Sequence, residues 1–257
     1  MPWGLCRAVA RRFPLAAEKA ADPVHAGQLA TYLGDALAAY GLELAGGMAD
    51  GQSYGEMAAA LLPDEPVDAL VLAYDIPDIA PGRATATYLS HLCPGGPMAF
   101  AVSDQGRAGA HTALRLLLDY ARCGTYERAL LVVAEQRSLP YDPGVAVEVP
   151  AAHCAVAVHL GPSALPAAVP RIVRGVDLAD VPTLLGDLGP ATVVLGGHLA
   201  DLDVKADSVM LADPDQPMTG VWEALAALDG PVVLADYDPA LRYLCVSSFG
   251  CVSSSSG

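Results

Sequence analysis

The 257-residue sequence predicts an α/β fold made of two similar halves. Three observations lead to this prediction. Short, continuous apolar runs such as Asp68–Ile76 (DALVLAYDI) and Ala129–Glu135 (ALLVVAE) are typical of strands that are buried on both faces of a parallel sheet. Segments with helical spacing of apolar residues lie between these runs. The same order of strands and helices then recurs, in a shorter form, from residue 171 to residue 249.

In the first half, the pattern predicts strands at Arg7–Val9, Asp68–Ile76, Met98–Val102, Ala129–Glu135 and Ala151–Leu160. Helices are predicted at Pro23–Tyr40, Gly51–Leu62, Gly82–Cys93 and from about Ala108 to Arg122. Proline and glycine separate these elements, as in Pro77–Pro81 and Pro94–Pro97, because both residues interrupt regular structure. We expect Met98–Val102 to be buried, because it is a short run of apolar residues.

In the second half, strands are predicted at Arg171–Leu178, Ala191–Gly197, Ser208–Asp213, Pro231–Asp236 and Arg242–Phe249, and helices at Val181–Leu188 and Met218–Leu228. Each half therefore follows a βαβαβαββ-type order, and the third helix of the first half is replaced by a short linker in the second. The Pro-rich segment Pro162–Pro170 is expected to join the halves. We therefore divide the chain into an N-terminal half, 1–161, and a shortened C-terminal half, 162–257.

Composition narrows the classes of partner. The formal net charge of −15, from 29 acidic residues against 14 Lys and Arg, argues against nucleic acid and anionic membrane surfaces. No apolar run approaches the roughly 18 residues of a membrane span, and Met1–Pro14 lacks the apolar segment of a secretory signal. We expect a cytoplasmic protein. The six cysteines show no paired spacing of a metal site, so neither a metal nor another cofactor is expected.

One junction between a strand and a helix has the geometry of an active site. The strand Met98–Val102 turns through Ser103–Gly106 into a helix with a wide apolar face. A helix N-terminus offers free N–H groups and the positive end of the helix dipole, both of which favour an anion. The residue at this position is Arg107, whose guanidinium stays protonated and cannot act as a nucleophile.

Seven segments carry a resemblance to a known family. They are DALVLAYDIPD, AFAVSDQGRA, RCGTYERALLVVAE and AHCAVAVHLG in the first half, and TVVLGGHLAD, DPDQPMTGVWEAL and YLCVSSFG in the second. In order and spacing they resemble the ketoacyl-ACP synthase III enzymes of the thiolase superfamily, over nearly the whole chain from about Ser53. The resemblance implies a thiolase-like fold, in which two homologous halves form α/β/α/β/α layers, here with the C-terminal half shortened.

The departures from the family pattern concern the catalytic residues. Family enzymes form an acyl thioester on a cysteine at the helix N-terminus, and a histidine and an asparagine stabilise the oxyanion. The resemblance puts Arg107 in the place of the cysteine and Asp215 or Gln216 in the place of the asparagine. An aspartate there would repel an oxyanion. Only His198 matches the type of a family catalytic residue.

The candidate site residues each have a structural alternative. Arg107 either plugs the pocket by pairing with Asp104 or Asp215, or binds an anionic ligand or reaches toward a partner's site; we favour the plug. His198 is either an acid/base or a loop residue that only forms hydrogen bonds. His111, on the helix near Arg107, is interpreted as a core histidine. Ser103 and Asp104 lie at the strand end, and no adjacent base activates Ser103 in the sequence.

Three functions are consistent with these residues. The first is a catalytically impaired subunit that pairs with an active ketosynthase III-like homologue as a heterodimer or heterotetramer, similar to the shortened partner in alkylquinolone-type heterodimeric synthases. The second is an acyltransferase or condensing enzyme that uses His198 as a base on an acyl-CoA or acyl-carrier-protein thioester, without a cysteine. The third is a ligand-binding module in which Arg107 holds a carboxylate. A homodimer is the alternative assembly, and an acyl carrier protein is a further candidate partner.

Overall fold

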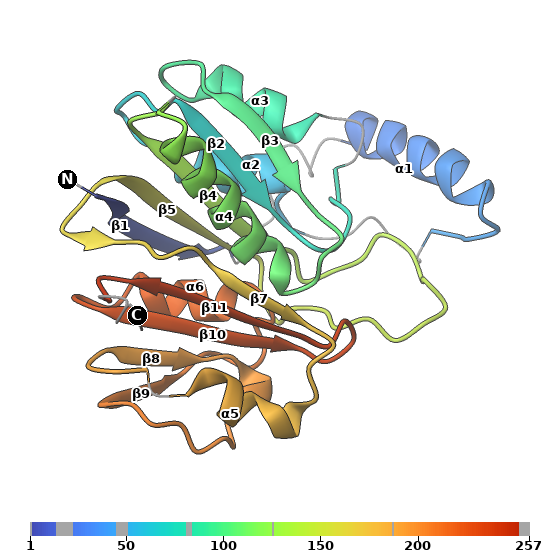
Figure 1. Cartoon of the computed structure of the whole chain (residues 1–257). Helices are drawn as coiled ribbons and strands as arrows, with labels where there is room; N and C mark the ends of the chain where they lie inside the picture. The colour runs from blue at the N-terminus through green and yellow to red at the C-terminus, as the bar shows by residue number, and fades with distance from the viewer. Residues whose placement is uncertain are drawn as a thin grey trace.

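The computed structural model of the chain describes residues 2–13, 23–44, 51–80, 84–124, 126–186 and 188–251. Two sheets dominate the described part. One has six strands in the order β3-β2-β4-β5-β1-β6, and the other has five in the order β7-β11-β10-β8-β9. Figure 1 shows the two sheets one above the other, with helices between them and on their outer sides.

The first part of the chain contains β1 (Trp3–Arg12), α1 (Pro23–Ala38), α2 (Tyr54–Ala59), β2 (Ala69–Ala73), α3 (Thr85–Leu92), β3 (Met98–Val102), α4 (Ala108–Arg122), β4 (Ala129–Glu135), β5 (Cys154–Pro162) and β6 (Leu165–Pro166). The second part contains β7 (Arg171–Arg174), the 3₁₀ turn η2 (Leu178–Asp180), α5 (Val181–Leu185), β8 (Thr192–Leu195), the 3₁₀ turn η3 (Gly197–Leu199), β9 (Ser208–Leu211), α6 (Thr219–Leu225), β10 (Val232–Asp238) and β11 (Tyr243–Phe249).

The two sheets share one topology. The order β3-β2-β4-β5-β1 in the first corresponds to β9-β8-β10-β11-β7 in the second. The pairing also agrees, because β2 runs parallel to both of its neighbours as β8 does to its own, and β4–β5 is antiparallel as β10–β11 is. The predicted pair of homologous halves is confirmed. The second half lacks a counterpart of α3. Between β8 and β9, where that helix would be, the chain forms only the 3₁₀ turn η3.

Successive side chains of a strand point to opposite faces of the sheet, and the layers can be assigned from the elements that pack on each face. Leu131 and Val133 of β4 pack on the inner side, in one cluster with Leu114 of α4 and Trp222 of α6. Leu130 and Val132 point to the outer side, where α2 and α3 cover the sheet. A third cluster joins α5 to the outer side of the second sheet. This is the predicted α/β/α/β/α arrangement.

Several predicted elements have other bounds in the structure, and four predictions need comment. The strand near Arg7–Val9 extends over Trp3–Arg12, because β1 pairs with β5 almost throughout its length. The predicted linker Pro162–Pro170 contains β6, which pairs with β1 and so extends the first sheet. The helix predicted at Gly82–Cys93 is α3, Thr85–Leu92, and residues 82 and 83 of the prediction lie outside the described residues. Met98–Val102 was expected to be buried but is a sheet edge, where Met98 is 41% exposed. The reason is that β3 has only β2 beside it.

Candidate functional site

A cavity of about 330 Å³ lies where the carboxyl ends of β2, β4 and β10 meet the N-termini of α4 and α6. It is lined by Tyr54, Asp75, Ile76, Gly106, Arg107, Glu135, Ala146, Val147, Glu148, Pro150, Pro217, Met218, Asp238, Pro239 and Ala240. The carboxyl ends of parallel strands are the usual location of sites in α/β folds. Arg107, at the start of α4, is the cationic side chain among these lining residues, and four of the others are carboxylates.

The turn into α4 fits tightly against carboxylates. Gly106 has a φ of +52°, and a Cβ at this position would lie 2.0 Å from Oδ2 of Asp238, so only glycine fits here. The Gly106 N–H donates to Oδ1 of Asp75 (2.8 Å), and the Arg107 N–H donates to Oδ2 of Asp238 (3.1 Å). The N–H groups that an oxyanion would need are therefore already bonded to carboxylates of the protein.

The Arg107 side chain fills the end of the cavity and is 5% exposed. Nη2 donates to both carboxylate oxygens of Glu148 (2.8 and 2.9 Å). Nη1 donates to the Pro217 carbonyl (2.5 Å) and to Oδ1 of Asp236 (3.3 Å). The guanidinium thus joins α4 to the start of α6, to β10 and to the connection between β4 and β5.

The predicted ion-pair partners of Arg107 are wrong. Asp104 is exposed and accepts a hydrogen bond from the hydroxyl of Ser103 (2.7 Å), and neither residue lines this cavity. Asp215 is also exposed, and its carbonyl accepts from the Ala151 N–H (2.8 Å). The turn that holds Asp104, which has a φ of +58°, directs it to the surface. The carboxylates that pair with Arg107 are Glu148 and Asp236, in place of the predicted Asp104 and Asp215.

Asp236 is a buried carboxyl beside this arginine. It is 1% exposed, and its Oδ2 has no hydrogen-bond partner among the described residues. Burial raises the pKa of Asp236 to about 7, against the opposing effect of the positive charge on Arg107. Gly196 leaves room for the side chain, because a Cβ there would lie 2.1 Å from Oδ1.

Glu135 and Asp238 occupy equivalent places in the two halves, each as the last residue of its strand. Glu135 ends β4 and accepts from the N–H groups of Met218 (2.7 Å) and Thr219 (2.8 Å) at the start of α6. Asp238 ends β10 and accepts from the N–H of Arg107 at the start of α4. Each half thus supplies a carboxylate that caps the inner helix of the other half, where the positive end of the helix dipole favours a negative charge.

Gln216 lies beside the cavity without lining it. It is 1% exposed, donates from Nε2 to the Thr219 hydroxyl (2.9 Å), and accepts at Oε1 from the Ala152 N–H (2.8 Å). Together with the bond from Ala151 to the Asp215 carbonyl, these contacts fasten the connection between β4 and β5 to the start of α6. Of the two residues in the predicted asparagine place, Gln216 is a structural anchor and Asp215 faces solvent.

His198 and His111 have different surroundings. The side chain of His198, in η3, is 39% exposed; its Nε2 lies 3.8 Å from Oε1 of Glu148, and it does not line the cavity. His111 is fully buried in α4, where its Nδ1 lies 2.7 Å from the Ser247 hydroxyl and its ring packs against Trp222. Burial lowers the pKa of His111 to about 3, so it is a neutral core residue at physiological pH.

Among the described residues that line the cavity there is no cysteine, serine or threonine, so none of them supplies a thiol or an aliphatic hydroxyl as a nucleophile. Cys154, in β5, is buried, and burial raises the pKa of its thiol to about 12. A thiol that stays protonated and buried does not attack a thioester. The described residues also contain no group of three or more His, Cys, Asp or Glu that could hold a metal ion.

Sequence reasoning missed the carboxylates that surround Arg107. Glu135, Asp236 and Asp238 each lie at the end of an apolar run, and a charged residue in that position is a usable signal. Glu148 lies in a loop between Val147 and Val149 and does not end an apolar run, so its sequence position gave no such signal. In the described part of the chain, no helix is long and apolar enough to cross a membrane.

Comparisons with known proteins agree on the fold. No family model and no curated protein matches the chain. Among solved structures, the 3-oxoacyl-[acyl-carrier-protein] synthase III of Aquifex aeolicus is 11% identical, with 96% of this chain and 99% of that chain covered and a TM-score of 0.58. The acyltransferase ChlB3 is 15% identical (98% of each chain, TM-score 0.64). The tetronic acid condensing enzyme AbyA1 is 16% identical (97% and 100%, TM-score 0.61). The chain therefore has the thiolase-like fold of ketoacyl synthase III enzymes.

Proposed function

We propose that this chain is a catalytically impaired ketosynthase III-like subunit. It would pair with an active ketosynthase-type partner in fatty-acyl, polyketide or other secondary-metabolite biosynthesis. The observation that carries the proposal is the side chain of Arg107, which is held by Glu148, Asp236 and the Pro217 carbonyl at the helix N-terminus where the resemblance expects the acyl-carrying cysteine. A protonated guanidinium cannot take up an acyl group.

The surroundings of Arg107 support the same proposal. A ketosynthase stabilises an oxyanion with donors that point into the cavity. Here Asp75, Glu135, Glu148 and Asp238 surround a single guanidinium, and the backbone N–H groups of Gly106 and Arg107 already donate to two of these carboxylates. Negative charge in these places would raise the energy of an oxyanion.

The alternative, a thioester-dependent enzyme with His198 as its base, finds less support. His198 is partly exposed and does not itself line the cavity; Oε1 of Glu148 lies 3.8 Å from its Nε2 and accepts a hydrogen bond from Arg107. A general base must lie within hydrogen-bond reach of the proton that it removes, directly or through one water. An acyl-CoA or acyl-carrier thioester remains a candidate ligand of the assembled complex, and no cofactor is proposed.

Intact-mass measurement after incubation with acyl-CoA and acyl-carrier thioesters tests the chemical part. We expect no adduct within residues 103–111 of the natural chain. The matched variant is Arg107→Cys, which puts a thiol at the same helix N-terminus and reports whether the site can still present a nucleophile. Peptide mapping is needed because the exposed Cys6 and Cys123 can react without any site. A stable adduct within 103–111 of the natural chain would overturn the proposal.

A further inference from the structure

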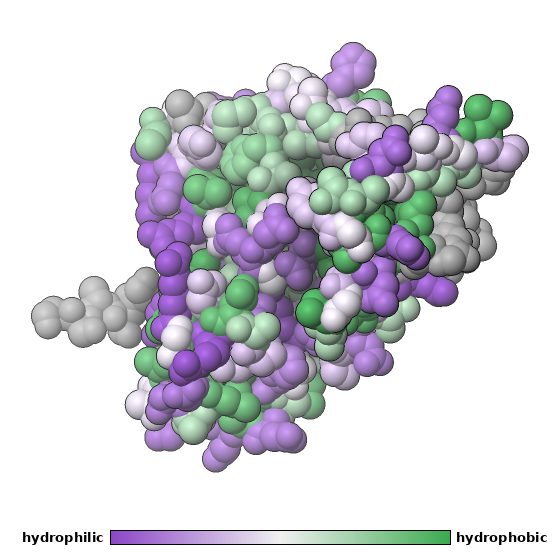
Figure 2. Space-filling model, turned by 90° about the vertical axis from the view of Figure 1, so that its right-hand side faces the viewer, coloured by the Kyte–Doolittle hydropathy of each residue, from purple (hydrophilic) through white to green (hydrophobic). Residues whose placement is uncertain are grey.

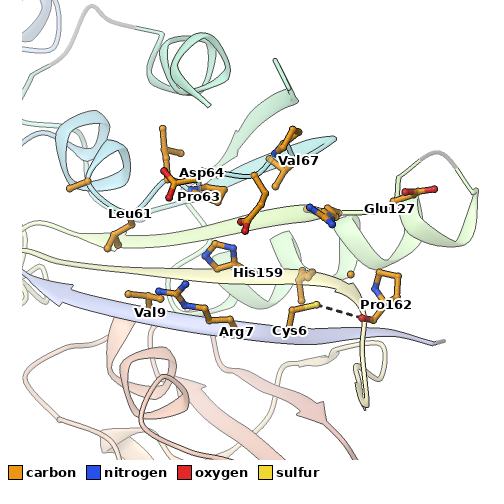
Figure 3. Close-up of a pocket in the computed structure, with 18 residues that line it drawn as sticks. Cys6, Arg7, Val9, Leu61, Pro63, Asp64, Val67, Glu127, His159 and Pro162 are labelled. Carbon is orange, nitrogen blue, oxygen red and sulfur yellow. Dashed lines mark hydrogen bonds between the residues drawn. The ribbon is translucent and has the colours of Figure 1, made fainter. Parts of the chain in front are cut away.

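A second cavity lies at the opposite end of the first sheet from Arg107. It measures about 780 Å³ and is bounded by the start of β4, the end of β5, part of β1 and the segment 60–67 that leads from α2 to β2. Figure 3 shows His159 and Arg7 next to each other on its floor, below Pro63 and Asp64. Because this is the amino end of β2 and β4, the cavity is separate from the one at Arg107.

The floor of the cavity contains a β-bulge. The register between β1 and β5 shifts between Leu5 and Arg7, and Arg7 then pairs directly with His159. The shift places Cys6 and Arg7, which are neighbours in sequence, along the same cavity, while Leu5 points into the core. Bulges change the direction of a side chain and occur often beside functional sites.

Two arginines, Arg7 and Arg128, line this cavity. Neither Arg7 nor Arg128 forms an ion pair with any residue in the described ranges. Five other arginines each lie within 3.9 Å of a carboxylate: Arg12, Arg107, Arg115, Arg122 and Arg242. Four more, which lie outside this cavity, also form no ion pair in the described ranges: Arg11, Arg137, Arg171 and Arg174. What distinguishes Arg7 and Arg128 is that both line one cavity together with His159, so their donors can face the same external anion.

Three carboxylates also belong to the cavity wall and restrict what fits. Asp64 and Glu65 come from the overlying segment, whereas Glu127 points away from His159 in Figure 3. A bare anion would be held only weakly against these charges. A ligand that is anionic at one end and carries hydroxyl groups at the other can donate hydrogen bonds to Asp64 and Glu65.

We propose that this cavity binds a small phosphorylated, hydroxyl-bearing molecule, with the phosphate between Arg7, Arg128 and His159 and the hydroxyl groups toward Asp64 and Glu65. The arginine fork matches the geometry of phosphate oxygens, and it can form two parallel hydrogen bonds to them. The site is independent of the proposed pairing with a ketosynthase.

His159 supplies a probe of binding that requires no activity. Burial, followed by the charge on Arg7, lowers the pKa of His159 below its ordinary value, while Glu65 acts in the opposite direction. Cys6 and Arg128 complete the groups on the neighbouring elements, and the charge on Arg128 opposes the effect of burial on the Cys6 thiol. A bound phosphate stabilises the imidazolium, so it raises the pKa of His159.

The experiment is an NMR titration of the His159 imidazole with glycerol 3-phosphate, inorganic phosphate and acetate, at an ionic strength held constant with chloride. We expect saturable shifts, tightest binding for glycerol 3-phosphate, and affinity about tenfold weaker in Arg7→Gln and in Arg128→Gln, from the loss of one charge-assisted interaction. Both side chains are exposed, so these variants leave the core intact. Arg7→Lys, which keeps the charge, should retain part of the affinity.

The matched control is Arg115→Gln, which removes an exposed arginine from α4, outside this cavity. It should bind glycerol 3-phosphate as the natural chain does. Shifts that do not saturate, or that are equal in all variants, would show only non-specific screening and would overturn the proposal. Acetate binding as tightly as the phosphate compounds would overturn the assignment to phosphate.

Discussion

At the scale of residues, Arg107 and Asp236 depend on each other. Asp236 is 1% exposed, and one of its oxygens has no partner among the described residues, so the guanidinium is the charge that makes an ionised carboxyl tolerable there. Removing one member of a buried pair is costly because it leaves the other charge without compensation. Exposed pairs behave differently, since water solvates each partner alone.

Arg107→Ala should therefore lower the free energy of unfolding by roughly 3–5 kcal/mol. The control is Arg242→Ala, which breaks the pair between Arg242 and Asp177 (2.6 Å), whose side chains are 50% and 70% exposed. That variant should lose only about 0–1 kcal/mol. Urea denaturation of both proteins gives the comparison. Equal losses in the two variants would mean that Arg107 is a ligand contact and not a structural plug.

The pH dependence of stability should report Asp236. Its pKa of about 7 in the folded protein lies above the value of about 3.9 in an unfolded chain. The folded state therefore keeps a proton that the unfolded chain releases, and the contribution of Asp236 to stability is present below about pH 4 and is lost as pH rises through about 7.

Asp236→Asn removes this dependence and leaves the other titrating groups in place. Relative to the natural chain, the variant should become progressively more stable from pH 4 to pH 7, and the difference should be constant above that range. Unfolding free energies at five pH values are sufficient. Parallel curves for the two proteins would show that Asp236 keeps an ordinary pKa in the folded state.

The sequence was informative about Arg107 but not about its partners. Helix spacing placed the arginine at the start of α4, and its chemistry excluded a nucleophile. Its partners are 41 and 129 positions away, at Glu148 and Asp236, so neither could be found from local patterns. The predicted Asp104 was nearer in sequence, but the backbone turn directs it to solvent.

At the scale of elements, the strap (residues 144–150) closes the cavity from the side of the connection between β4 and β5. Val145 and Val149 of the strap are 70% and 40% exposed. Four other strap residues line the cavity: Ala146, Val147, Glu148 and Pro150. Figure 2 views the side on which this connection lies, where apolar residues are mixed with hydrophilic ones. Both oxygens of Glu148 bind Arg107, which ties the middle of the strap to α4.

Glu148→Gln should loosen the strap, because it replaces a carboxylate that accepts through both oxygens with a neutral amide that has one acceptor oxygen. A loss of ~1.4 kcal/mol corresponds to about tenfold faster cleavage by thermolysin before the strap valines. Asp229→Asn, which removes one exposed carboxylate from the turn after α6, serves as the control for net charge and should be cleaved at the natural rate. Unchanged cleavage in Glu148→Gln would mean that backbone contacts alone hold the strap.

Element prediction succeeded for continuous apolar runs, both for β4, which is buried on both faces, and for β3, which is a partly exposed sheet edge. The bounds predicted for Met98–Val102 and Ala129–Glu135 agree with β3 and β4. For β1 it found a strand at Arg7–Val9 but not its full length, because only the pairing with β5 defines the bounds Trp3–Arg12. β6 is two residues long and carries no pattern of its own, so it was interpreted as linker.

At the scale of the whole molecule, both sheets leave an unpaired strand at one edge. β3 ends the first sheet and β9 the second, in equivalent positions. Beside β3, the rings of Phe100, Tyr120 and Tyr126 stack edge to face, and Tyr120 is 37% exposed. Val209 and Leu211 of β9 are also exposed. Edges with exposed apolar side chains invite pairing with another chain, so covering them stabilises the soluble protein.

We expect the edge of β3 to be the one that pairs. Its unpaired backbone groups run beside the aromatic cluster of Phe100, Tyr120 and Tyr126, so an added strand would gain both hydrogen bonds and apolar contact. Self-pairing would join two sites that both hold an arginine in the nucleophile place. Pairing with a cysteine-bearing homologue would cover the same edge and let this chain contribute to the wall of the partner's acyl pocket.

Two lysine substitutions separate the two edges. Ala101→Lys, on the exposed side of β3, places a charge where the partner strand would lie and should abolish co-elution with the co-expressed homologue. Leu211→Lys makes the same change on β9, at a residue 56% exposed, and should leave the complex intact. Size-exclusion chromatography with light scattering gives the stoichiometry, expected as a heterodimer or heterotetramer. The opposite pattern would place the interface on β9, and a well-behaved monomer unaffected by the homologue would remove the proposed pairing altogether.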